Sequence, residues 1–319
     1  MKIAIAATVF ALFASMTAHA QQDYPNRPIR LIVPFTAGST SDISARLIGQ
    51  KISESLGQPV LVENRPGASG TIGMQAVAKS KPDGYTLAVG SVSSTVVPQV
   101  LMKTPPFELL RDFVPVALIA STALVLVVNK DSPANSVQDL VAEAKREPGK
   151  GTYGNSAGLY QLCMELFKLQ AGIDLLAVGY KGPADAATDL IAGRLTVMPD
   201  SLGAATRNIQ AGRTKALAVL STNRSAALPG VPTMTELGYK DFDFNGWIGI
   251  LAPAGTPDAI VQRLNLEINR AAALDEVKQK FTNMALDAVR STPREYAETL
   301  ARETAKYAKI VKDANIERQ

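Results

Sequence analysis

Short apolar segments rich in β-branched residues alternate with amphipathic stretches along most of this chain. The first series runs in the order strand 29–33, helix 41–56, strand 59–63, helix 69–79 and strand 85–89. In the first predicted helix, apolar residues recur at positions 48, 52 and 56, which is the spacing of one helix face. This order predicts an α/β fold, with an open, mixed, mostly parallel sheet that helices flank on both faces.

A second series follows the apolar run 113–128, which is long enough for two strands and for a crossing between domains. It predicts a helix capped by Ser136, then strand 152–154, helix 158–170, strand 175–178, helix 183–192, strand 196–198, helix 202–211 and strand 216–220. Residues 242–251 form a second plausible crossing. After them, Thr256 and Pro257 predict the N-cap and first position of a helix, and a last helix follows Pro293.

Two crossings between two series of elements predict two lobes, the second inserted into the first. We expect lobe 1 to comprise residues 21–122 and 246–319, and lobe 2 to comprise residues 123–245. Ligands of open α/β sheets bind outside the carboxyl ends of the strands. With two lobes, those ends can face each other across a cleft.

The first 20 residues have the pattern of a secretory signal peptide. Lys2 precedes an apolar stretch at 3–16, and Ala18-His19-Ala20 forms a cleavage site of the A-x-A type. The apolar stretch is short for a membrane span, and no cysteine follows the cleavage point. We therefore expect a soluble protein exported to the periplasm without a lipid anchor.

Composition excludes several classes of chemistry. His19 is the only histidine and lies in the predicted signal peptide, and Cys163 is the only cysteine. A Ser-His-Asp triad and a histidine-containing zinc site are therefore excluded, and we expect no metal and no cofactor. The formal charge is +4, but lysine and arginine are scattered, so nucleic acid is not an expected partner. We expect a monomer.

The turn after the first strand carries the leading candidate site. Its small and hydroxyl-bearing residues precede a helix, whose first N–H groups lack intrahelical partners and favour anions. Gly38 allows close backbone approach, Ser39 and Thr40 offer hydroxyl donors, and Phe35 can form a wall. A tight turn with a simple cap explains the same residues equally well. We expect Asp42 to order the loop, because its charge would repel an anion.

Comparable turns follow other predicted strands. One contains Ser91 and Ser93, and another contains Ser156, Ala157 and Gly158 at the start of a second-lobe helix. Two helix starts in two lobes suggest a ligand with separated carboxylates. Further candidates are Tyr180 and Asp200; Asp200 either accepts from a ligand or caps the next helix, and we favour the cap.

Cysteine and tryptophan each occur once in this chain. Cys163 lies beside Met164 and Leu166 within a predicted helix, so we interpret it as a small buried hydrophobe. Trp247, the only tryptophan, either stacks at the cleft or packs the second crossing, and the pattern does not separate the two.

Several motifs together resemble the periplasmic receptors of tripartite tricarboxylate transporters, also called the Bug family. They are residues 24–30 (YPNRPIR), 33–42 (VPFTAGSTSD), 63–68 (ENRPGA), 81–86 (KPDGYT), 179–182 (GYKG), 228–233 (LPGVPT) and 251–257 (LAPAGTP). The resemblance implies a type II periplasmic-binding fold that closes around a small carboxylate and delivers it to membrane permease subunits.

By position, the resemblance implicates a set of ligand-binding residues: Phe35, Thr36, Ala37, Gly38, Ser39, Asp42, Ser156, Ala157, Gly158, Tyr180 and Asp200. The family commonly has a Gly-Gly pair where this chain has Gly38 and Ser39, which affects ligand choice. Alternatives are a sensory receptor for a signalling partner and a periplasmic serine hydrolase. The missing histidine and the absence of a G-x-S-x-G motif argue against the hydrolase.

Overall fold

The computed structural model describes residues 24–155, 158–180 and 182–318. The predicted signal peptide at residues 1–20 lies outside the described residues. Among the helices described, none has the length and apolar character needed to cross a membrane.

The first sheet is built around three parallel strands. In β1 (Ile29–Val33), every residue pairs with β2 (Val60–Asn64), and three residues also pair with β3 (Thr86–Ser91). The antiparallel strands β9 (Asn245–Pro253), β4 (Phe113–Asn129) and β10 (Asp287–Ala288) extend this sheet in the order β10-β4-β9-β3-β1-β2. Because parallel strands end at the same edge, the turns after β1 and β3 lie at one edge of the sheet.

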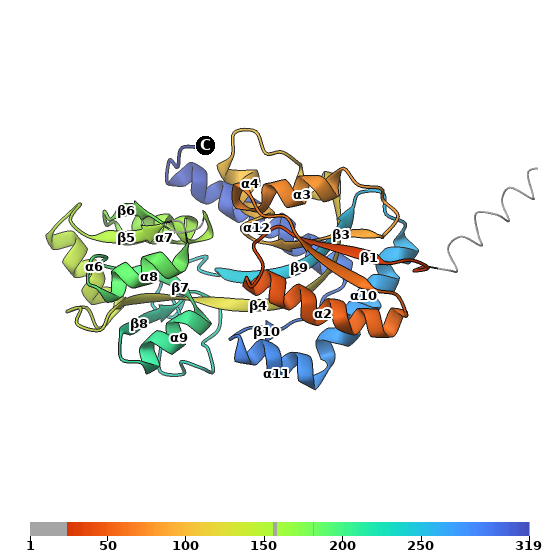
Figure 1. The fold of residues 1–319 in the computed structure, drawn as a ribbon. Helices are drawn as coiled ribbons and strands as arrows, with labels where there is room; N and C mark the ends of the chain where they lie inside the picture. Colours follow the sequence, from red (N-terminus) through yellow and green to blue (C-terminus); the bar gives the residue numbers. More distant parts are fainter. Residues whose placement is uncertain (1–23, 156–157, 181, 319) are drawn as a thin grey trace, which may run out of the picture.

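Helices cover both faces of this sheet (Figure 1). They are α2 (Thr40–Leu56), α3 (Thr71–Ala78), α4 (Val96–Leu101), α5 (Leu109–Asp112), α10 (Asp258–Ala273), α11 (Asp275–Asn283) and α12 (Pro293–Asp313), with the short η1 (Ala68–Gly70) before α3. Side chains alternate along β1, so that Leu31 and Val33 pack with α2, α10 and α11, whereas Ile32 belongs to the core beneath α3, α4 and α12.

Strand β4 continues from the first group of elements into the second. Its first part pairs with β9 as far as Ala123, which lies opposite Asn245. From Leu124 onward its partners are β7 (Met198–Ser201) and β8 (Thr214–Val219). The run that is long enough for two strands and a crossing forms one 17-residue strand, which changes partners along its length. Register shifts near Pro115 accommodate a residue that has no N–H to donate.

The second group surrounds the far end of β4, at the left in Figure 1. It also contains the parallel pair β5 (Thr152–Asn155) and β6 (Leu176–Gly179). Its helices are α6 (Val137–Arg146), α7 (Gly158–Ala171), α8 (Pro183–Ile191) and α9 (Leu202–Gln210). The change of β4 partners between residues 123 and 124 agrees with the expected lobe boundary, which stays a prediction.

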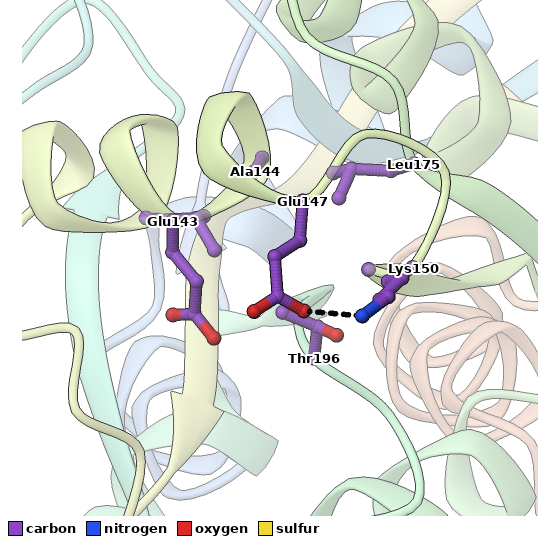
Figure 2. Close-up of a pocket in the computed structure, with 8 residues that line it drawn as sticks. Glu143, Ala144, Glu147, Lys150, Leu175 and Thr196 are labelled. Atoms are coloured by element: carbon purple, nitrogen blue, oxygen red, sulfur yellow. Dashed lines mark ion pairs between the residues drawn. The ribbon is translucent and has the colours of Figure 1, made fainter.

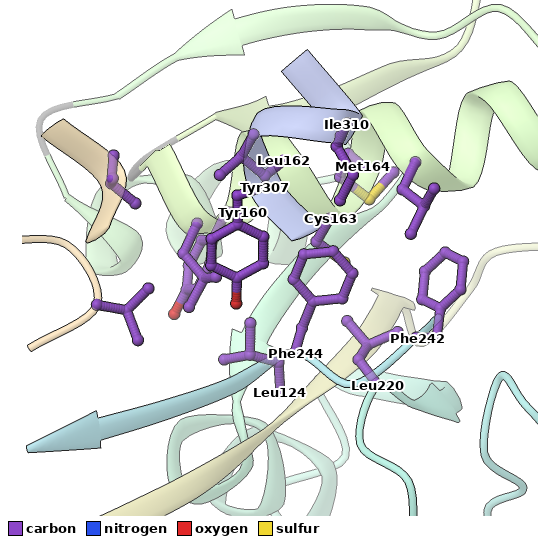
Figure 3. Close-up of a cluster of buried hydrophobic side chains, with 14 of the residues drawn as sticks. Leu124, Tyr160, Leu162, Cys163, Met164, Leu220, Phe242, Phe244, Tyr307 and Ile310 are labelled. Atoms are coloured by element: carbon purple, nitrogen blue, oxygen red, sulfur yellow. The ribbon is translucent and has the colours of Figure 1, made fainter. Parts of the chain in front are cut away.

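Buried side chains of α7 and α12 belong to one continuous apolar core (Figure 3). Tyr307 of α12 stacks on Phe244 with 5.6 Å between ring centroids, beside Cys163 of α7. Cys163 is fully buried, and burial raises the pKa of its thiol. Its interpretation as a small buried hydrophobe is confirmed.

Some helices and strands begin or end at other residues than predicted, because their side chains form other hydrogen bonds. Ser136 caps α6 as predicted, by accepting from the N–H of Asp139. Thr256 does not cap α10, because its hydroxyl donates to the carbonyl of Pro253, and Pro257 takes the N-cap position. The strand predicted at 196–198 lies later, at β7. Helix α11 and strand β10 were not predicted.

Trp247 packs against α12 at the second crossing, and it also lines a groove. Its side chain is buried, and Nε1 donates to Oε2 of Glu303 at 2.8 Å. Its ring meets Tyr296 edge-on at 5.4 Å between centroids. Helix α12 therefore holds strand β9 at the point where the chain returns from the second group of elements.

Candidate functional site

The turn between β1 and α2 is open to solvent at its centre. Pro34 is buried and Phe35 is half-buried, whereas residues 36–38 and Thr40 are exposed. Gly38 has φ +81°, a conformation that side-chain-bearing residues rarely adopt. Ser39 is the N-cap of α2, and its Oγ accepts from the N–H of Asp42 at 3.3 Å. Both proposed donors, Ser39 and Thr40, thus lie at a helix start.

Asp42 is buried and bonds within the protein. Its Oδ2 accepts from the N–H of Gly38 at 2.9 Å, and its Oδ1 accepts from Nδ2 of Asn64 at 2.9 Å. Arg46 forms an ion pair with it at 3.0 Å. Burial raises the pKa of the Asp42 carboxyl, but hydrogen bonds from Arg46, Gly38 and Asn64 outweigh burial and lower the pKa overall. The loop-ordering interpretation of Asp42 agrees with these contacts.

Some backbone donors of the turn are used internally and others remain open. The N–H of Gly38 is taken by Asp42, and the N–H of Ser39 donates to the carbonyl of Thr36 at 3.2 Å. The N–H groups of Thr40 and Ser41 belong to the first turn of α2 and have no hydrogen-bond partner within the described residues. Thr40 is exposed and Ser41 is buried, so the N–H of Thr40 is the better placed of the two for an anion.

The turn after β3 lies next to the turn after β1. A Cβ at Gly70 would come within 2.8 Å of Cβ of Ser94 and 3.3 Å of Cβ of Pro34, so only a glycine lets these segments meet. Ser91 and Ser93 are half-buried here, and the Ser91 hydroxyl lies 3.3 Å from that of Ser94. The Ser91 and Ser93 candidates therefore lie near the first turn.

Gly158 places the start of α7 directly against α4. A Cβ at this position would lie 2.4 Å from Cγ1 of Val97 and 3.1 Å from Cδ1 of Leu101. The start of α7 therefore lies one short helix away from the Ser91–Ser93 turn. The candidates Ser156 and Ala157 lie outside the described residues.

Gly158→Ala is expected to lower the free energy of unfolding by about 1–3 kcal/mol, because the new methyl group overpacks the contact with Val97. Urea unfolding measures this change. Gly179→Ala is the control, because a Cβ there meets nothing within 4 Å, and it should stay within about 0.5 kcal/mol of wild type. Equal stability of the two variants would contradict the close contact between α7 and α4.

Tyr180 and Asp200 differ in how their polar groups are used. The Tyr180 hydroxyl donates to Oδ2 of Asp189 at 2.8 Å. Asp200 is buried, and burial raises the pKa of its carboxyl to about 6. The favoured cap interpretation of Asp200 was wrong, because it lies inside β7 and Ser201 is the N-cap of α9. The N–H of Ser201 donates to Oδ1 of Asp200 at 2.8 Å.

The structure brings some candidates together and leaves others apart. The turns after β1 and β3 and the start of α7 form one neighbourhood. Within the described part of the chain, no hydrogen bond connects the first turn to Tyr180 or Asp200. The role of all these residues in ligand binding stays a prediction.

Two residues that support the first turn were missed as candidates. Asn64 lies opposite Val33 in the β1–β2 register, so it ends its strand beside the turn. Arg46 follows Asp42 by four residues, a spacing that pairs opposite charges on a helix. The position of Asn64 directly after a predicted strand and the four-residue spacing of Asp42 and Arg46 are both visible in the sequence. Arg65, the next residue after Asn64, is exposed, and its guanidinium lies 3.4 Å from the carboxylate of Glu63.

Two other cavities lie away from this neighbourhood. Figure 2 shows a pocket of about 210 Å³ at the end of α6, where Glu147 and Lys150 pair at 3.1 Å. A groove of about 860 Å³ is lined by Trp247 and Glu303 together with residues of β4. Apart from Trp247, none of the residues considered for ligand binding lines either cavity. The described residues contain no cluster of three or more metal-ligating side chains.

Comparisons with known proteins identify a matching family. Residues 44–316 match the model of the tripartite tricarboxylate transporter family receptor. The chain is 38% identical to the protein BugT of Bordetella pertussis over 309 residues, covering 96% of this chain and 95% of BugT.

Two solved structures of similar proteins hold carboxylates. R. palustris Rpa4515 with adipate has a TM-score of 0.80 at 35% identity, covering 92% of this chain and 99% of Rpa4515. MatC from Rhodopseudomonas palustris with bound malate has a TM-score of 0.78 at 28% identity, covering 90% of this chain and 100% of MatC.

Proposed function

Because the chain belongs to the tripartite tricarboxylate transporter family of receptors, we propose that it captures a small organic carboxylate and delivers it to the membrane subunits of such a transporter. The family consists of periplasmic solute receptors, not enzymes. The observation that carries the proposal is the open pair of N–H groups at Thr40 and Ser41, directly after β1.

A dicarboxylate is the ligand class that we propose. Adipate and malate, which the two similar structures hold, each carry two carboxylate groups. Uncharged donors at a helix start suit reversible capture, because they bind a carboxylate without a strong ion pair. In this proposal, Ser39 and Thr40 hold one carboxylate, and the start of α7 at Gly158 holds the other. Tyr180 contacts the ligand through its ring, because its hydroxyl donates to Asp189, and Asp200 accepts from a ligand hydroxyl.

The ligand binds between two lobes in this proposal. Lobe 1 comprises residues 21–122 and 246–319, and lobe 2 comprises residues 123–245. The exchange of β4 partners at residue 124 and the start of β9 at Asn245 support these boundaries. Closure then shifts an equilibrium toward the state in which both lobes contact the ligand.

Export through a signal peptide at residues 1–20 completes the proposal. The family description supports a periplasmic location and a membrane transporter as the partner. The basic and apolar pattern of the first residues is the support within this chain.

A thermal-shift screen tests the proposed function. Dicarboxylates, tricarboxylates, aromatic carboxylates, amino acids and nicotinate-like acids are compared with the matching amides. A bound acid at about 100 times its Kd should stabilise the fold by about 2.7 kcal/mol, which raises Tm by roughly 5 °C. The amides, which lack the charge, should give no shift. A flat screen would contradict a carboxylate ligand, and turnover of any hit would contradict the receptor function.

A further inference from the structure

Three side chains connect both ends of the β1–α2 turn to the body of the protein. Asp42 accepts from the N–H of Gly38, and Asn64 donates from Nδ2 to the carbonyl of Phe35 at 3.1 Å. Asn64 and Asp42 are themselves bonded at 2.9 Å. The third side chain is Arg46. Its guanidinium pairs with the Asp42 carboxylate at 3.0 Å and donates to Oδ1 of Asn64 at 3.0 Å.

We propose that Asp42, held by Asn64 and Arg46, is a positioning residue that presents the open donors of this turn to the ligand without contacting the ligand. This inference rests on the proposed function and adds three residues that support the site without touching the ligand. Asp42 fixes Gly38 on one side of the turn and, through its own N–H, the Oγ of Ser39 on the other.

The bond to Ser39 gives that side chain a defined direction. A hydroxyl has one hydrogen and two lone pairs. The N–H of Asp42 occupies a lone pair of Ser39 Oγ, so the hydroxyl hydrogen remains available to a neighbouring acceptor. Ser39 is half-buried at the start of α2, beside the open N–H of Thr40. Ser39 and Thr40 then act together as donors to one carboxylate.

The charge of Asp42 is satisfied within the protein. Its side chain is 4% exposed, whereas that of Arg46 is 52% exposed. Arg46 therefore brings a positive charge to the surface beside a buried negative one. This arrangement keeps the negative charge away from solvent next to a site for anions.

Asp42→Ala tests the inference with adipate and malate as probes. We expect the Kd for adipate to rise at least about tenfold, because the turn loses its anchor. The amide of Gly38 should exchange its hydrogen at least about tenfold faster, because its acceptor is gone. Asp42→Asn keeps one oxygen that can accept from Gly38 but loses the acceptor for Asn64, so it should recover the exchange rate of Gly38 to within about threefold of wild type and the affinity only in part. Asn64→Ala should act in the same direction as Asp42→Ala.

Gln50→Ala on the exposed side of α2 is the control and should leave affinity and exchange unchanged. If wild type binds adipate and Asp42→Ala binds it equally well, the positioning role is wrong and the proposed function stands. If Asp42→Asn binds more tightly than wild type, Asp42 faces the ligand, which also overturns the inference. If wild type binds neither acid, the proposed dicarboxylate function fails, and unchanged exchange at Gly38 in Asp42→Ala would separately overturn the positioning role.

Discussion

Ser39→Asp is expected to abolish binding of adipate and malate while leaving the fold intact. Aspartate is as good an N-cap as serine, so the start of α2 keeps its cap. The new carboxylate, however, lies where the proposal puts a ligand carboxylate. Repulsion between two such charges at an effective dielectric of about 20 amounts to about 3 kcal/mol, which weakens binding at least about a hundredfold. Calorimetric titration measures the affinity, and thermal unfolding without ligand measures the fold.

Ser39→Asn is the matched control for this variant. Asparagine also caps helices and has a similar size, but it adds no charge. It should bind within about tenfold of wild type, since only one hydroxyl donor is exchanged for an amide. Unchanged affinity in Ser39→Asp would show that this turn is not the ligand site.

Glu303→Gln is expected to stabilise the protein at alkaline pH and to change little at acid pH. Burial raises the pKa of the Glu303 carboxyl from 4.5 to about 7, despite the opposing hydrogen bond from Trp247 and the charges of Lys306 and Arg302. A carboxyl whose pKa is raised in the folded state favours folding only while it is protonated. Its contribution is complete below about pH 4.5 and is lost as the pH rises through about 7.

The rise of the Glu303 pKa from 4.5 to about 7 corresponds to up to about 3 kcal/mol of unfolding free energy, at about 1.4 kcal/mol per pKa unit. Glutamine removes the titration and still offers an oxygen to Nε1 of Trp247. Urea unfolding at pH 4 and pH 8 measures the difference between the variant and wild type. Glu298→Gln, an exposed position on the same helix, is the control and should give the same small difference at both values. Equal effects of the two variants at pH 8 would contradict the burial of an ionised Glu303.

Strong local patterns predicted much of the fold. β1 lies at the predicted residues, because four of its five positions are apolar and buried, and Arg30 is the one half-buried exception. Helix α12 follows Pro293 as expected, and its capping box joins Thr292 to Glu295. The open donors at the start of α2 follow from the same local rules, because the small and polar residues of the turn precede a periodic apolar face.

Features that depend on contacts between distant segments could not be predicted from the local sequence pattern. The run 113–128 is long enough for two strands and a crossing, but nothing in it shows that one strand exchanges partners at Leu124. Asp200 reads as a cap, but its pairing opposite Val125 extends β7 past it and gives the cap to Ser201. Asn64 reaches the first turn only through the β1–β2 register. Such assignments depend on which segments meet in space.

Amide chemical-shift changes during a titration with adipate test the central claim most directly. We expect the largest changes at Thr40 and Ser41, smaller ones at Ser91 and Ser93, and none at Glu147 beside the pocket of Figure 2. Largest changes around Trp247 and Glu303, with Thr40 and Ser41 unaffected, would contradict it.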